Sequence, residues 1–150
     1  MTIDPSPAAV DAWIRLNRLQ QAMMAKISRA FREGGFPPYA WYDALWELEK
    51  AGESGLRPSD IERQLLISQS NVSRLIERMV AKGVAGRQEC IEDGRGMIVA
   101  ITDEGRALRR EMWPVYAACI KELLDDGLNE GDRHHLGALL SKVENAQARN

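Results

Sequence analysis

The sequence has few of the features that mark a secreted, membrane-inserted or catalytic protein. Its 150 residues include two cysteines, Cys90 and Cys119, and two histidines. No basic segment followed by an apolar core opens the chain, and no run approaches the roughly 18 apolar residues of a membrane span. Glycine-rich phosphate loops, nucleophile elbows and zinc-protease motifs are also missing. We therefore expect a cytoplasmic protein with reduced thiols that is not an enzyme, needs no cofactor and has no membrane partner.

The chain also lacks an excess of either charge. Lys and Arg number 20 and Asp and Glu 22, which gives a net charge of −2 and counts against a protein that coats a polyanion. The average hides a local bias, because residues 69–87 hold four bases and one acid and carry +3. With 45% apolar and 28% charged residues, the composition is that of a globular protein, and the length predicts one domain over 1–150. The charge balance therefore leaves nucleic-acid binding open.

Apolar residues recur at intervals of three and four along most of the chain, which predicts helices. The expected helices span 8–33, 39–50, 58–65, 69–82 and 103–126, with a last one that begins at Asn129 or Glu130. Ser68 and Thr102 are the expected N-caps of the helices 69–82 and 103–126. The period changes in 85–91 and 97–102, which predict two strands joined by a polar loop. The fold class is thus mainly α (α+β), in the order of a winged helix-turn-helix domain.

The helix expected over 69–82 has the most informative surface. Val72, Leu75, Ile76 and Met79 form one apolar stripe. The DNA-binding candidates on and before its polar side are Ser68, Gln69, Ser70, Asn71, Ser73, Arg74 and Arg78. Serine, asparagine and glutamine hydrogen-bond to base edges, and arginine binds guanine or phosphate. A merely solvated helix face is the alternative interpretation.

The predicted hairpin offers a second DNA-binding candidate. Arg95 lies between two glycines at the tip, where an arginine suits the narrow and most negative minor groove. Asp93 could hold an arginine in a bidentate pair, and Arg87 in the first strand is expected to contact phosphate or a groove. An ordinary polar hairpin loop is the alternative.

The stretch 56–108 resembles the MarR family of bacterial transcription regulators. The matching motifs are LISQSNVSRLIERMVAKGV, a DGR wing and ITDEGRAL, and the flank FPPYAWYDALWEL fits as well. The resemblance implies a homodimer joined by the flanking dimerisation helices, about 8–33 and 103–148, with the DNA-binding part at about 39–102. It further implies a pseudo-palindromic operator and a small-molecule or redox signal.

The residues themselves support a dimer. A winged helix core needs only about 39–102, yet the flanking helices add further apolar faces, such as Trp13, Leu16 and Leu19 in the first. Apolar surface of that extent is a liability in a monomer. A two-fold dimer would place its recognition helices about one DNA turn, roughly 34 Å, apart.

The aromatic residues are candidates for an effector site. Trp13, Trp41, Tyr42 and Trp113 could line a crevice that, by the resemblance, takes a small aromatic or phenolic effector. Core or interface packing is the alternative for each. Cys90 and Cys119 are interpreted as core residues, so redox sensing is not carried over. Glu130 and His134 have the spacing of a metal-ligand pair but no further ligands, so no metal site is predicted.

We therefore predict a sequence-specific DNA-binding transcriptional regulator, a repressor that acts as a homodimer and is released from double-stranded DNA by a small molecule. Two alternatives remain open at this point. One is a winged-helix module that binds proteins rather than DNA, and the other is a metal-responsive regulator.

Overall fold

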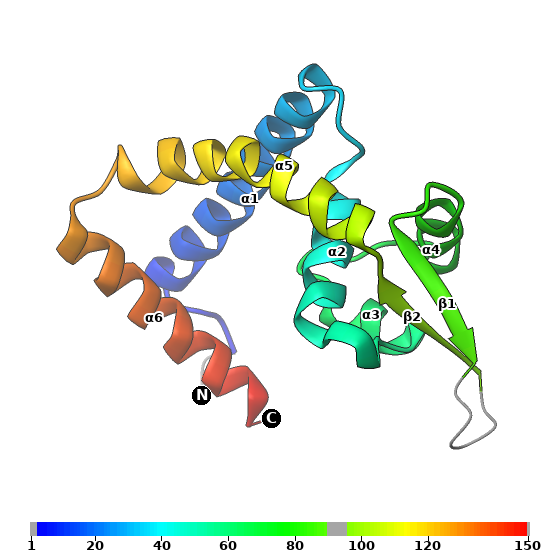
Figure 1. Cartoon of the computed structure of the whole chain (residues 1–150). Coiled ribbons are helices and arrows are strands. Elements are labelled where there is room, and N and C mark those ends of the chain that lie inside the picture. Colours follow the sequence, from blue (N-terminus) through cyan, green and yellow to red (C-terminus); the bar gives the residue numbers. More distant parts are fainter. Residues whose placement is uncertain (1–2, 90–95, 150) are drawn as a thin grey trace. The chain divides into compact units, whose positions relative to one another are not determined.

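The computed structural model describes residues 3–89 and 96–149, and it is mainly helical (Figure 1). Its elements are α1 (Pro7–Glu33), α2 (Tyr39–Ala51), the 3₁₀ turn η1 (Gly52–Ser54), α3 (Pro58–Gln64), α4 (Val72–Ala81), β1 (Ala85–Glu89), β2 (Met97–Ile101), α5 (Asp103–Ile120), the π-helical segment η2 (Lys121–Asp125) and α6 (Glu130–Ala148). The predicted fold class and order of elements are confirmed. No helix in this part of the chain is long and apolar enough to span a membrane.

The chain divides into two compact units. One is residues 27–115, and the other combines residues 1–26 with 116–150. The first unit holds α2, α3, α4 and the hairpin. Its core is made by these elements together, and its buried members are Ala44, Leu45, Leu48, Ile61, Leu65, Val72, Leu75, Ile76, Met79, Val84, Ala85, Val99 and Ile101. The apolar stripe predicted for the helix now labelled α4 is therefore confirmed.

The hairpin is anchored at its base by a third backbone segment. Strands β1 and β2 are antiparallel, with Ala85 opposite Ile101. The N–H of Leu56 donates to the carbonyl of Val99 at 2.8 Å, and the N–H of Val99 donates back at the same distance. Gly55 precedes this bridge with φ +64°, and a Cβ there would lie 2.4 Å from the Val99 oxygen. This bridge, which sequence reasoning missed, fixes where the wing leaves the core.

Side-chain hydrogen bonds cap the N-termini of three helices, α4, α5 and α6. The predicted helix start after Ser68 is wrong, because α4 begins at Val72 and the side chain of Asn71 accepts the N–H of Arg74 at 3.0 Å. Thr102 does cap α5, since its Oγ1 accepts the N–H of Gly105 at 3.1 Å and donates to the Gly83 carbonyl at 2.6 Å. Asn129 forms a reciprocal capping box with Asp132, as a helix starting at Glu130 requires.

Two element lengths differ slightly from the sequence prediction. The helix expected over 103–126 is α-helical only to Ile120 and continues as the π-helical segment η2. The second strand ends at Ile101, because Thr102 turns away to cap α5. Neither difference alters the order of elements.

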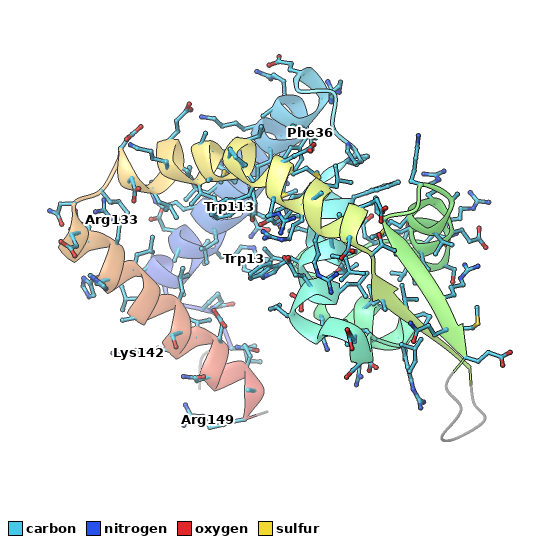
Figure 2. All side chains as sticks on the ribbon, viewed as in Figure 1. Trp13, Phe36, Trp113, Arg133, Lys142 and Arg149 are labelled. Carbon is cyan, nitrogen blue, oxygen red and sulfur yellow. The ribbon has the colours of Figure 1, made fainter. Side chains whose placement is uncertain are left out.

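The second unit carries apolar side chains that its own chain leaves exposed. On α1 these are Val10, Trp13, Ile14, Leu16 and Leu19, and on α6 they are Leu136, Leu139 and Val143. Helix α6, whose side chains include Arg133 and Lys142 in Figure 2, buries none of its residues. The periodic apolar faces predicted for these helices are present, but they are not covered within the described chain.

Candidate nucleic-acid interface

Helix α4 presents one polar face at the surface of the first unit. The buried side of α4 consists of Val72, Leu75, Ile76 and Met79. The residues on the opposite side of the helix must therefore face solvent. Ser73, Arg74, Glu77 and Arg78 are exposed there. The helix packs beside β1 (Figure 1), which places the start of the wing next to it. Helix α4 and the strand that begins the wing are therefore neighbours, and both carry exposed side chains.

Three arginines on α4 and β1 form no ion pair with a carboxylate of the described residues. Arg74 and Arg78 on α4 and Arg87 on β1 are exposed, and none of them forms an ion pair with any residue whose position the structure defines. Other cations of the same unit are paired, as Arg63 is with Asp60 and Arg109 with Glu49. Exposed guanidinium groups without a described carboxylate partner are available to phosphate or base edges.

The polar candidates before α4 lie in a loop rather than in the helix. Ser68 and Ser70 are exposed and Gln69 is half-buried in the stretch between α3 and α4. Asn71 uses its Oδ1 as the cap of α4, an interaction worth about 1 kcal/mol in helices generally. Its amide nitrogen remains a donor. The predicted base-contacting residues are thus divided between this loop and the first turn of α4.

A buried carboxylate holds the same loop, and sequence reasoning missed it. Asp43 lies on α2 with 4% of its surface exposed, and its Oδ2 accepts the N–H of Ile67 at 3.1 Å. Burial raises the pKa of this carboxyl above its ordinary value, against the lowering effect of hydrogen bonds from the backbone of Leu66 and Ile67. The available signal was an acid placed on the inward side of an apolar helix, between Tyr42 and Ala44.

Two wing candidates and one cysteine lie outside the described residues. These are Asp93, Arg95 and Cys90. The described part of the wing places Arg87 opposite Val99, with its side chain exposed. The proposed roles of Asp93 and Arg95 stay predictions.

Two of the four aromatic candidates for the effector site contact each other. Tyr42 is buried and stacks on Trp113, labelled in Figure 2, with ring centroids 6.3 Å apart. Phe31 packs against Tyr42 at 6.5 Å, which extends an aromatic cluster within the same unit. Trp13 belongs to the other unit and is 68% exposed. Trp41 lines a cavity of the first unit.

That cavity has a volume of about 500 Å³ and lies within the first unit. Its walls are Gly35, Phe36, Pro37, Trp41, Lys82, Val84 and Leu108. The lining is apolar and aromatic with a single cation, and the size falls in the range of small-molecule sites. Lys82 is also the C-cap of α4, so the cavity adjoins the C-terminal end of this helix.

The remaining candidates are a cysteine considered for redox sensing and a Glu–His pair considered for metal binding. Cys119 is buried, in keeping with its interpretation as a core residue. His134 Nε2 lies 3.8 Å from a carboxylate oxygen of Glu130, with both side chains more than 80% exposed. Across the described ranges no three His, Cys, Asp or Glu side chains gather as metal ligands would.

Known proteins resemble this chain in both sequence and structure. A MarR family model matches residues 37–96, which run from just before α2 to just before β2. The HTH-type transcriptional regulator PecS of Dickeya dadantii is 29% identical over 104 residues, which cover 69% of this chain and 62% of PecS. The match thus spans less than two thirds of PecS. An uncharacterised HTH-type regulator of Bacillus cereus is 24% identical over 131 residues, 87% of this chain and 85% of that protein.

Solved structures share the whole architecture. A MarR family regulator from Silicibacter pomeroyi is 25% identical, with a TM-score of 0.71 over 88% of this chain and 86% of its own. A MarR family regulator from Streptomyces coelicolor, solved in complex with DNA, has the same fold, with a TM-score of 0.83 and 20% identity over 97% of this chain and 91% of its own. In sequence the chain is therefore similar to the MarR family over residues 37–96, and in structure it shares the winged helix-turn-helix fold of these MarR family regulators.

Proposed function

We propose that the protein represses transcription as a homodimer that binds a pseudo-palindromic DNA operator. The observation that carries the proposal is the exposed polar side of α4 beside β1, where Arg74, Arg78 and Arg87 form no ion pair with any residue that the structure describes. The Streptomyces coelicolor relative of the same fold was solved with DNA, which favours DNA over a protein as the partner.

The proposed contacts follow from the chemistry of each position. Ser73 and the loop residues Ser68, Gln69, Ser70 and Asn71 carry short polar groups that read base edges in the major groove. Arg74 and Arg78 bind guanine or phosphate, and Arg87 binds phosphate beside the wing. Arg95, with Asp93, is proposed to enter the minor groove.

The proposed dimer would cover the apolar faces of α1 and α6. These faces include Trp13, Leu19, Leu139 and Val143, all exposed in the single chain. A second copy is the natural occupant, because identical patches meet across a two-fold axis and the operator is proposed to have the same symmetry.

The first prediction concerns the arginines of α4. We expect the double variant Arg74→Ala/Arg78→Ala to bind its operator at least roughly 100-fold more weakly, since each base or phosphate contact contributes about 1–3 kcal/mol. The operator is first selected from random duplexes, and affinity is then measured by fluorescence anisotropy at several salt concentrations. The variant should also show a shallower salt dependence, by about 1 in slope for each phosphate that it no longer binds.

A matched variant controls for the loss of charge. Lys142→Ala/Arg149→Ala removes two cations from the other unit, at exposed positions near the end of the chain, and should retain wild-type affinity. If the α4 variant binds as tightly as wild type, the interface is assigned to the wrong surface. A folded dimer for which no duplex can be selected at low salt would favour the protein-interaction alternative.

The cavity near Lys82 is the proposed effector site. Its apolar and aromatic walls suit a flat ring, and the Lys82 ammonium suits a carboxylate or phenolate. A ligand held there would contact the C-cap of α4 and Val84, which links α4 to β1. Binding that favours one position of α4 over another would shift the dimer away from its DNA-binding form, so regulation would be repression relieved by the effector.

The second prediction tests this cavity with benzoate and salicylate as probes. We expect these anions to weaken operator binding by the wild-type protein, and we expect Lys82→Met to reduce that response because the anion loses its counter-charge. The measurement is the operator Kd with and without millimolar probe. Lys142→Met is the control and should respond as wild type does. A response that survives in Lys82→Met would place the effector elsewhere.

A further inference from the structure

We propose that Asp43 is a positioning residue for operator recognition, because it holds from inside the core the loop that carries the base-contacting residues to the start of α4. The inference rests on the proposed function, and it gives that function a residue that does not touch DNA. No feature of the sequence motif points to this role, since Asp43 belongs to α2 and the loop lies between α3 and α4.

The loop is held at two hydrogen-bonded points. Asp43 accepts the N–H of Ile67 at 3.1 Å. Four residues after Ile67, Asn71 caps α4 through the N–H of Arg74. Ser68, Gln69 and Ser70 lie between these two points, so their approach to a base edge is set by both.

The surroundings of Asp43 show that the carboxylate is costly to keep. It is the one buried charged side chain among the described residues, and the adjacent loop residue Leu66 is 70% exposed. Burial raises its pKa, Glu47 on the same helix raises it further, and Lys50 lowers it. A buried charge without a paired cation is costly, whereas removal of the acceptor alone would leave the Ile67 N–H without its partner, which is also unfavourable. Because these two effects oppose each other, a requirement for stability alone does not explain an acid at this position.

The exposure of Leu66 indicates that the Asp43 carboxylate fixes the backbone of the loop. A large apolar residue at a turn would tend to rotate inward and shift the neighbouring backbone, but the hydrogen bond from the Ile67 N–H to Asp43 holds this stretch with Leu65 buried and Leu66 exposed. The following serines then start from one defined backbone position. A pre-set loop lowers the ordering cost of binding and thereby favours the operator over other duplexes.

The test separates positioning from stability. Asp43→Leu removes the acceptors and Asp43→Asn keeps one, while Glu47→Gln changes a neighbouring acid one turn along α2. Thermal unfolding establishes that each variant folds, and anisotropy gives its Kd for the selected operator and for a scrambled duplex. We expect Asp43→Leu to remain folded, with a loss of unfolding free energy no larger than the cost of the one lost acceptor. Its preference for the operator should nevertheless fall roughly tenfold or more, the effect of about one mismatched base pair.

The conservative variants complete the pattern. Asp43→Asn should recover part of the preference, and Glu47→Gln should match wild type. If Asp43→Leu folds and discriminates as well as wild type, the positioning role is overturned. A wild-type protein that discriminates no duplex would instead overturn the proposed function, and the role of Asp43 with it.

A second measurement needs no variant that could unfold. In the wild-type protein, the NMR amide signals of Leu66 and Ile67 should shift together as the Asp43 carboxyl titrates above the ordinary aspartate pKa. Amides that ignore this titration would show that the loop is not held by Asp43, whatever the DNA-binding result.

The raised pKa of Asp43 also determines how the free energy of unfolding should depend on pH. A group whose folded pKa lies above its unfolded value contributes most to stability below the unfolded pKa, and that contribution is lost as pH rises through the folded pKa. The variant Asp43→Asn has no titratable group at this position and therefore lacks this pH-dependent contribution. The free energy of unfolding of this variant, relative to wild type, should therefore increase between about pH 4 and about pH 7 in urea titrations, and a decrease would contradict the burial of the charge.

Discussion

Replacing Gly105 by alanine is expected to lower the free energy of unfolding by about 3 kcal/mol, although alanine favours helices over glycine by about 1 kcal/mol. Gly105 lies in the first turn of α5, where a Cβ would come 2.1 Å from the carbonyl oxygen of Val84 and 2.8 Å from Cγ1 of Ile101. The first obstacle is backbone that leads from α4 into β1, so it cannot move without disturbing the hairpin. A loss of this size is a large part of the stability of a small domain.

Chemical denaturation measures the effect, and Gly137 provides the control. Gly137 is also helical, in α6, but a Cβ there meets nothing within 4 Å, so Gly137→Ala should stabilise the chain by about 1 kcal/mol. The two substitutions are chemically identical and should have opposite signs. If Gly105→Ala is as stable as wild type, α5 does not approach the Val84 backbone as closely as the structure shows.

The second large effect is expected at the proposed dimer face. Leu139→Glu/Val143→Glu should convert the dimer to a monomer of 16.8 kDa, because burying two unpaired charges in an interface costs several kcal/mol. Leu139 and Val143 are both exposed in the single chain, so its fold should survive. Since each half-site would then be bound separately, operator affinity should fall by roughly 10²-fold or more.

Sedimentation and anisotropy on the same samples test this result. Ser141→Glu/Asn145→Glu adds the same two charges about half a turn away around α6, at 100° per residue, and should remain a dimer. A double glutamate variant at Leu139 and Val143 that still sediments as a dimer would move the interface to another face. A wild-type protein that is monomeric would remove the dimer from the proposal altogether.

Helix α4 shows how much of the fold could be predicted. Its apolar positions, Val72 to Met79, repeat within one local stretch, so the amphipathic helix was predictable from spacing alone. Its start was not, because Ser68 and Asn71 are comparable capping residues and local sequence does not choose between them. The choice involves the loop held by Asp43, whose contact to Ile67 joins segments far apart in the chain. The bridge between Leu56 and Val99 was hidden for the same reason.

The candidate site was predictable in its composition more than in its geometry. Periodicity indicated which side chains of α4 face outward, and Arg74 and Arg78 are exposed as expected. The same periodicity on α1 and α6 does not distinguish a core from an interface, since both require an apolar face. The structure distinguishes them by burial, with Ile27 buried and Leu19 exposed on one helix. The grouping of Trp41 with Lys82 around a cavity depends on tertiary contacts and had no local signal.

The affinity of the wild-type protein for a selected duplex, titrated with salt beside a scrambled duplex, tests the central proposal most directly. We expect selection to return a pseudo-palindrome with half-sites about 10 base pairs apart, bound by a dimer far more tightly than the scrambled sequence. The logarithm of the binding constant should fall linearly with that of the salt concentration, as contacts from Arg74, Arg78 and Arg87 to phosphate require. A folded dimer that binds both duplexes equally, or neither at low salt, would contradict it.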